Sequence, residues 1–187
     1  MTVGAVASTF RHLKCLPDNI KKMGKVYSLY SRQKVPASLE EVWRFFSDSS
    51  NLLQVTPPHL NLKVTNEVYG ETVYAGQVMT YNVKPVLGIP LAWMTEITHV
   101  EPLKYFVDEQ RKGPYKLWHH QHHFKAIEGG VEMIDIVHYR LPLGFLGSIA
   151  NTLLVKKELE KIFLFRYQRI IELFGKWEGE KMEVTIK

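Results

Sequence analysis

Residues 35–58, VPASLEEVWRFFSDSSNLLQVTPP, set the order of the predicted elements, because they place two short helices between one strand-like segment and all the others. Ser38 is followed three residues later by Glu41, a spacing typical of a capping box, and apolar residues then recur at helical intervals. This pattern predicts a first helix directly after Ser38. A second helical turn is expected before Pro57 and Pro58, which cannot continue a helix.

The segment before these helices and six segments after them have the composition of strands. Residues 25–35, KVYSLYSRQKV, alternate in polarity and are rich in residues that favour strands. Turn signals with Gly and Pro separate the later segments, and such short connections predict an antiparallel sheet, since parallel pairs need long crossovers. The later strands are expected around residues 60–69, 75–85, 90–100, 104–111, 115–127 and 131–141.

A long amphipathic helix is predicted from Ser148 to Phe174, with Gly175 in the C-cap position. At ~1.5 Å per residue it would be about 40 Å long, enough to cross a whole sheet. We therefore expect an α+β fold in which a seven-stranded curved antiparallel sheet wraps around this helix. The expected domains are a flexible N-terminal extension over residues 1–24, one folded domain over 25–174 and a C-terminal tail over 175–187.

The composition limits the classes of function. The 187 residues carry a formal charge of +5, much of it in residues 1–24, and this balance does not indicate a nucleic-acid-binding protein. No apolar run approaches the ~20 residues that span a membrane. Cys15 is the only cysteine, which excludes an intrachain disulfide, and residues 1–24 lack the pattern of a secretory signal. We therefore expect a cytoplasmic monomer or homodimer that neither binds nucleic acid nor inserts into a membrane.

Three stretches carry a resemblance to a known superfamily: VWRFFSDSSNL at 42–52, FVDEQRKGPYKLWHHQHHF at 106–124 and MIDIVHYRLPLG at 133–144. With the order of elements, they resemble the START/Bet v 1-like superfamily, also called SRPBCC, and within it the bacterial ligand-binding group described as polyketide cyclase/dehydrase-like. The resemblance covers residues 25–174 and implies a helix-grip fold that binds a ligand internally. It specifies function weakly, because the superfamily includes lipid carriers, hormone receptors and cyclases.

Four histidines lie within five positions of the segment YKLWHHQHHF, residues 115–124. Because strand side chains alternate between the two faces of a sheet, these histidines separate into two pairs. His120 and His122 are predicted to face the long helix, whereas His119 and His123 are predicted to face solvent. We assign a role only to the inward pair.

Two turn signals predict how this strand pairs with its neighbours. If the two glycines of EGGV form a two-residue hairpin turn, His122 lies opposite Val137. If KGP forms a three-residue loop, His120 lies opposite Phe106. Both registers place large apolar side chains and several polar ones on the same inward face.

Acidic residues on the neighbouring strands then lie diagonal to the inward histidines, Asp108 to His120 and Asp135 to His122, within reach of hydrogen bonds. Unpaired buried polar groups cost ~1–3 kcal/mol each, so these groups must pair with one another, with water or with a ligand. Three interpretations stay open: an internal Asp–His network that only fixes strand register, the polar end of a ligand pocket, and a metal site.

We favour the pocket, because of the resemblance more than the composition. The expected function is binding, as a carrier or sensor, of a small and largely hydrophobic molecule such as a lipid, a polyketide or an aromatic metabolite. The residues expected to contact it share the inward face: Phe106, Asp108, Gln110, Trp118, His120, His122, Phe124, Asp135 and Tyr139.

The alternative is an acid/base enzyme that uses both Asp–His pairs, with His120 as general base, Asp108 as its partner and Tyr139 stabilising an oxyanion. No activated nucleophile, phosphate-binding loop or dinucleotide fingerprint is evident in the sequence. In a metal site, the His-x-His pair of His120 and His122 would chelate one ion, with Asp108 or Asp135 adding an oxygen ligand. Metal chemistry ranks lower, because the sequence does not define which residue is the third ligand. We therefore expect no cofactor and no metal.

Overall fold

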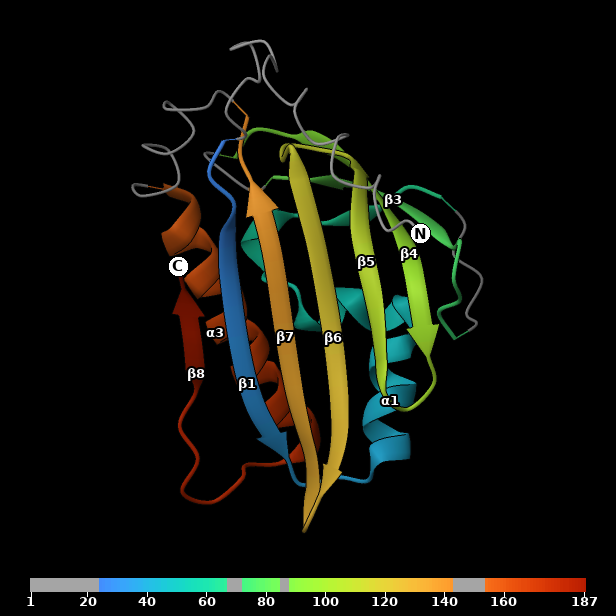
Figure 1. The fold of residues 1–187 in the computed structure, drawn as a ribbon, viewed down its shortest axis with the longest axis vertical. Coiled ribbons are helices and arrows are strands. Elements are labelled where there is room, and N and C mark those ends of the chain that lie inside the picture. Colours follow the sequence, from blue (N-terminus) through green and yellow to red (C-terminus); the bar gives the residue numbers. More distant parts are fainter. Residues whose placement is uncertain (1–23, 67–71, 85–87, 143–153) are drawn as a thin grey trace, which may run out of the picture.

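The structure is a computed structural model that describes residues 24–66, 72–84, 88–142 and 154–187. Its strands form one curved antiparallel sheet in the order β2-β3-β4-β5-β6-β7-β1-β8, and its helices lie on one side of that sheet (Figure 1). The predicted helix-grip architecture is confirmed. The strands are β1 (Tyr27–Val35), β2 (Lys63–Val64), β3 (Val78–Val83), β4 (Leu91–Glu101), β5 (Tyr105–Lys112), β6 (Leu117–Ile127), β7 (Gly130–Arg140) and β8 (Glu183–Ile186). The helices are α1 (Leu39–Ser47), the 3-10 helices η1 (Ser49–Val55) and η2 (Pro58–Leu60), and α3 (Lys156–Phe174).

Helix α1 begins where the capping-box spacing predicts. The backbone N–H of Glu41 donates to Ser38 Oγ at 3.3 Å, and the backbone N–H of Ser38 donates to Glu41 Oε2 at 3.0 Å. The helix buries Trp43, whose ring packs edge-on against Phe106 and Phe124 with centroids 6.1 and 5.5 Å away. These contacts fix α1 against β5 and β6, the strands that carry most of the inward polar residues.

Helix α3 ends as predicted at Phe174, where Gly175 has a φ of 97° and its N–H donates to the carbonyl of Ile171 at 2.9 Å. The predicted start at Ser148 lies outside the described residues, as do residues 1–23 of the predicted extension. None of the described helices is long and apolar enough to cross a membrane. The buried side of α3 consists of Leu159, Phe163 and Ile170.

The sheet has one strand more than the seven expected. Within the predicted C-terminal tail, residues 183–186 form β8, which pairs antiparallel with β1 so that Ile186 lies opposite Leu29. Val184 and Ile186 pack against an apolar cluster that contains Leu29 and Phe163. Apolar and polar residues alternate over 182–187, a strand signal that the sequence interpretation missed when it assigned this segment to a tail.

The hairpin between β6 and β7 turns one residue earlier than predicted. Gly130 belongs to β7 and lies opposite Ile127, so the two-residue turn is Glu128–Gly129, with Gly129 at a φ of 82°. Gly130 is needed in the strand because a Cβ there would lie 2.1 Å from the carbonyl oxygen of Val35 on β1. The pairing moves by two residues, which keeps every side chain on its predicted face.

The correction changes which inward residues face each other across the sheet. His122 lies directly opposite Asp135, where we predicted Val137, and Val137 instead faces His120. The predicted hairpin register would also place Phe124 opposite Asp135, but Phe124 pairs with Met133.

The loop between β5 and β6 is also wider than the predicted three residues. The side-chain amide of Gln110 closes it, donating through Nε2 to the carbonyl of Tyr115 at 2.7 Å and accepting from the Tyr115 N–H at 3.2 Å. His120 therefore lies opposite Asp108, and His122 opposite Phe106, two residues away from the predicted pairing. Both carboxylates now stand directly across from a histidine, where diagonal neighbours were expected.

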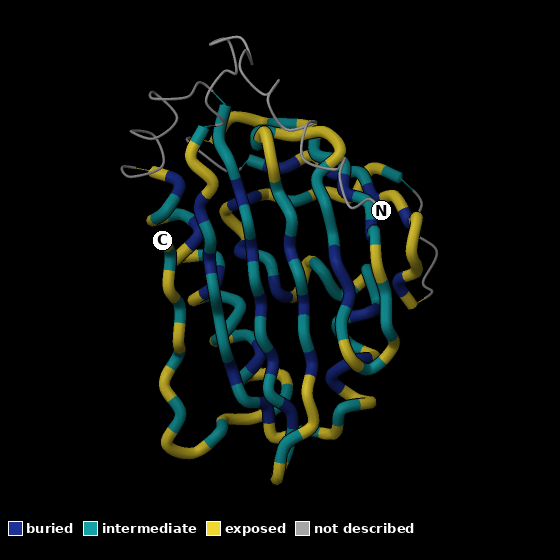
Figure 2. Tube along the Cα trace, in the orientation of Figure 1, coloured by how far each residue is buried: buried dark blue, intermediate teal, exposed yellow. Residues whose placement is uncertain are grey.

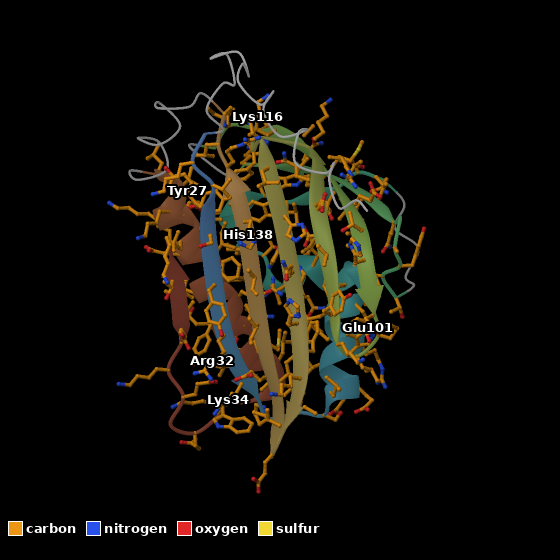
Figure 3. The ribbon with its side chains drawn as sticks, viewed as in Figure 1. Tyr27, Arg32, Lys34, Glu101, Lys116 and His138 are labelled. Atoms are coloured by element: carbon orange, nitrogen blue, oxygen red, sulfur yellow. The ribbon has the colours of Figure 1, made fainter. Side chains whose placement is uncertain are left out.

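Burial follows this alternation. Along β7 every second residue is buried, as the alternating colours of the central strands in Figure 2 show. The other face of the sheet carries charged pairs: Arg32 on β1, labelled in Figure 3, forms ion pairs with Glu132 at 3.1 Å and Glu183 at 2.9 Å. The functional residues must therefore be sought on the face that the helices cover.

Candidate functional site

A cavity of about 240 Å³ lies between the covered face of the sheet and the helices, and it is partly open to solvent. Its walls are mainly apolar and come from every layer of the fold. Sheet residues supply one wall, including Met79, Trp93, Ile97, Phe106 and Trp118. The helices supply the other, including Phe46, Leu52, Leu159 and Phe163.

Four charged or titratable side chains line one part of this cavity: Asp108, His120, His122 and Arg166. His122 lies between two carboxylates, with Nε2 2.8 Å from Asp108 Oδ2 and Nδ1 3.0 Å from Asp135 Oδ1. His120 is held in the same way, with Nε2 3.1 Å from Asp135 Oδ1 and Nδ1 3.5 Å from Asp108 Oδ2. Together, Asp108, Asp135, His120, His122 and Arg166 are called the Asp–His–Arg cluster.

Arg166, on α3, is the member of the cluster that the sequence interpretation missed. Its Nη2 lies 3.4 Å from Asp135 Oδ1, and its guanidinium lies 5.1 Å from the centre of the Phe46 ring. Its Nε is buried with no hydrogen-bond partner among the described residues. A signal for it exists, since Arg166 comes three residues after Phe163 and four before Ile170, on the apolar stripe of the helix.

The carboxylates of the cluster stay ionised. Burial alone would raise the pKa of Asp135, but the charge of Arg166 and the hydrogen bonds from both histidines outweigh it and hold this pKa well below its usual range. Burial likewise opposes ionisation of Asp108, but the hydrogen bond from His122, together with the charges of His122 and Arg166, leaves the pKa of Asp108 lowered.

The pKa values of the two histidines shift in opposite directions although the residues are neighbours on one face. Burial and the nearby His122 lower the pKa of His120. Burial alone would also lower the pKa of His122, but its hydrogen bonds to Asp108 and Asp135 outweigh burial, so this pKa is raised. With His122 protonated, its Nδ1 and Arg166 Nη2, 3.3 Å apart, both donate toward Asp135 rather than to each other. Two anions and two cations then balance the cluster.

Five of the nine predicted contact residues line the cavity: Phe106, Asp108, Trp118, His120 and His122. Asp135 lies behind the histidines and lines a small adjacent cavity with Arg166.

The remaining three predicted residues do not line the main cavity. Tyr139 is fully buried and stacks on Tyr27 with ring centroids 5.4 Å apart. Phe124 packs in the apolar core beside Trp43, and Gln110 closes its loop. Each shares the inward face, but a curved sheet presents only part of that face to one cavity.

Comparisons with known proteins show the fold alone. None of the protein-family models matches the chain, and no curated protein sequence matches it. Solved structures do: protein CV1439 from Chromobacterium violaceum has a TM-score of 0.61 at 10% identity, covering 80% of this chain and 98% of its own. Protein Ms6760 from Mycobacterium smegmatis has a TM-score of 0.56 at 16% identity, covering 78% of this chain and 89% of its own.

A third similar structure belongs to Ara h 8.0201, a Bet v 1 homologue. Its TM-score is 0.52 at 14% identity, and the match covers 79% of this chain and 99% of that one. The resemblance predicted from the sequence is thus confirmed at the level of architecture: this chain has a helix-grip fold similar to that of Ara h 8.0201.

Proposed function

We propose that the protein binds a small, largely apolar organic molecule in the cavity between the sheet and the helices. The observation that carries this proposal is the cavity itself, whose aromatic and aliphatic walls meet a compact group of polar side chains at one place. Its volume of about 240 Å³ is below the range of about 300–1,000 Å³ typical of pockets for drug-sized ligands. The ligand is therefore small, or only part of it enters.

The fold supports this proposal, because Bet v 1-like proteins are often small-ligand binders. A lipid chain, a polyketide or an aromatic metabolite suits the walls, and the Asp–His–Arg cluster would orient its polar end. We propose further that the protein acts as a carrier or sensor of this molecule and belongs to the polyketide cyclase/dehydrase-like group. Cytoplasmic location and the monomeric or dimeric state stay predictions.

Native mass spectrometry of freshly purified protein tests whether a molecule is retained, since a bound metabolite adds its mass to that of the chain. Titration with the neutral apolar fluorophore phenylnaphthylamine tests the cavity directly. Wild-type protein is expected to bind it saturably with increased fluorescence. Absence of both a retained mass and saturable fluorophore binding would refute the proposal.

Adjacent leucines on η1 provide a matched pair of variants. Leu52 lines the cavity, whereas Leu53 does not line it and is 50% exposed. Leu52→Trp is expected to fill part of the cavity and weaken fluorophore binding at least ~10-fold, a difference of about 1.4 kcal/mol. Leu53→Trp adds the same bulk to the surface and should leave binding unchanged. Equal effects of the two variants would place the binding site elsewhere.

A second candidate, an acid/base enzyme, is favoured by one observation: His120 lines the cavity between two carboxylates. Tyr139 does not line the cavity, so this candidate rests on His120 and Asp108. Once a retained molecule is identified, His120→Gln separates the two functions. A carrier would lose affinity only modestly, whereas an enzyme would lose turnover of that molecule.

A further inference from the structure

Three potential ligand atoms converge at the polar part of the cavity: Asp108 Oδ2, His120 Nδ1 and His122 Nε2. Asp108 Oδ2 lies 2.8 Å from His122 Nε2 and 3.5 Å from His120 Nδ1, and the three residues offer ligand atoms within 4.8 Å of one another. Ligand atoms that bind a tetrahedral Zn²⁺ at ~2.0–2.2 Å stand ~3.3 Å apart. The distances here lie on both sides of that value, so a small adjustment of side chains brings all three onto one ion.

In each imidazole, the ring nitrogen that does not face Asp108 lies against one and the same carboxylate, that of Asp135. His120 Nε2 lies 3.1 Å and His122 Nδ1 3.0 Å from the same atom, Asp135 Oδ1. Histidines that bind a metal almost always donate their other N–H to a carboxylate, a carbonyl or water, which fixes the tautomer and turns the ligating nitrogen toward the ion. Both histidines have this arrangement, and their remaining ring nitrogens, His120 Nδ1 and His122 Nε2, face Asp108.

We propose that Asp108, His120 and His122 form a binding site for one divalent first-row transition metal ion at the wall of the cavity. The sequence offered the His-x-His pair with Asp108 or Asp135 as the oxygen ligand, and the observed register favours Asp108 by placing it directly opposite His120. Two imidazoles with one carboxylate suit zinc or iron, whereas Mg²⁺ and Ca²⁺ prefer oxygen ligands. The proposal does not rest on binding of an apolar molecule.

The charges around the site are compatible with a divalent ion. Arg166 Nη2 lies 3.4 Å from Asp135 Oδ1, so the guanidinium neutralises the charge of Asp135. The Arg166 charge therefore lies on the Asp135 side of the histidines and not between the three ligands. The ion must displace the proton that His122 Nε2 shares with Asp108 Oδ2, which is released to solvent. With both histidines then neutral, Asp108 alone faces the ion, and the complex keeps one positive charge. Three protein ligands leave at least one coordination position, which a hydroxide or an anionic group entering from the cavity would occupy.

The test uses the metal ions alone. Full-length protein is dialysed against EDTA, transferred to chelator-free buffer near neutral pH, and titrated with Zn²⁺ by calorimetry. Saturable binding of one Zn²⁺ per chain is expected, and Co²⁺ as a spectroscopic substitute should give visible absorption with the same stoichiometry. In wild-type protein, Zn²⁺ should shift the imidazole NMR signals of His120 and His122 more than those of His119 and His123.

Matched variants locate the ion without removing the fold. Asp108→Asn should weaken Zn²⁺ binding more than ~100-fold, and Asp135→Asn, which keeps all three ligands, by ~10–100-fold. The control His119→Gln/His123→Gln removes two histidines from the outer face of the same strand and should bind Zn²⁺ like the wild type. Circular dichroism measures whether each variant is folded. If a variant does not fold, the NMR shifts of the wild-type histidines on addition of Zn²⁺ test the site in its place.

The proposal fails if wild-type protein shows no saturable Zn²⁺ or Co²⁺ binding, or if Asp108→Asn binds undiminished. It also fails if the outer-face control loses the ion, since the histidines of the surface would then be the ligands. Phenylnaphthylamine binding by metal-free protein is measured in parallel. If that binding is absent and no molecule is retained, the proposed function is refuted and the metal site still stands. If the fluorophore binds but Zn²⁺ and Co²⁺ do not, the metal site is refuted and the proposed function still stands.

Discussion

Strand β6 exposes the same residue type to two environments. On its covered face, His120 and His122 have side chains only 9% and 8% exposed, each held between Asp108 and Asp135. On its outer face, the His119 side chain is 29% exposed and its Nδ1 lies 3.0 Å from Glu109 Oε1, while the His123 ring lies tilted against Tyr105 with centroids 5.6 Å apart. His138 on β7 lies on this same outer face (Figure 3).

The comparison shows that burial, more than residue identity, sets what a histidine can do. An exposed His–Glu pair exchanges hydrogen bonds with water at little cost, and such pairs contribute ~0–1 kcal/mol. A buried histidine must keep its partners, because removing one leaves an uncompensated polar or charged group in a low-dielectric interior. The covered pair therefore has fixed geometry and altered pKa values, which a binding site requires.

The largest difference between the faces is expected from their carboxylates. Asp135→Asn should lower the free energy of unfolding by about 3–5 kcal/mol, because Arg166 and His122 lose their shared anion inside the protein. Glu109→Gln, which removes the outer partner of His119, should cost less than about 1 kcal/mol. Urea denaturation followed by tryptophan fluorescence measures both. Similar losses for the two variants would remove the distinction between the faces.

A second contrast uses two arginines of α3. Arg166 has a side chain 12% exposed against Asp135, whereas Arg169 is 33% exposed and pairs with Glu172 on the surface. Arg166→Met should cost about 1–3 kcal/mol through the lost charged hydrogen bond. Arg169→Met should cost less than about 1 kcal/mol. Thermal and urea unfolding measure the loss in free energy of unfolding for each variant. A larger loss for Arg169→Met than for Arg166→Met would contradict the greater contribution assigned to the buried arginine.

The smallest effect is expected at an exposed carboxylate that still has good hydrogen bonds. The side-chain and then the backbone hydrogen bond of Ser38 lower the pKa of Glu41. The ionised form therefore stabilises the folded state above the unfolded pKa, and this contribution is lost as the pH falls through the lowered folded pKa. Wild-type protein should melt slightly above Glu41→Gln near neutral pH and together with it near about pH 3. A pH-independent difference would show that the charge has no part in it.

The faces of the strands were predictable from the sequence, but their pairing was not. Side chains on a strand have a period of two, so a shift of two residues leaves His120 and His122 inward while changing their partners. Gly129 and Gly130 both tolerate a turn, and only the close approach of Gly130 to Val35 on β1 decides which one turns. That contact joins residues far apart in the chain, and no local pattern contains it.

The candidate site was predictable in part for the same reason. Alternation placed Asp108, His120 and His122 on one face, and the structure adds that Asp108 and His120 are direct neighbours. Tyr139 and Gln110 share the face but lie away from the cavity, because sheet curvature cannot be derived from strand periods. Arg166 was detectable on the stripe of α3, where a single charge among apolar residues is an inconsistency that a functional site explains.

The pairing of β8 with β1 has a practical consequence for handling this protein. Removing residues after Gly175 would leave the outer edge of β1 without its neighbour over Leu29–Arg32. Uncovered backbone donors and acceptors on such an edge recruit strands from other molecules and promote aggregation. Lys187 also exchanges two backbone hydrogen bonds with Ser28, at 2.9 and 3.1 Å, so the pairing with β1 continues one residue beyond β8. Expression designs should therefore keep residues 183–187 intact.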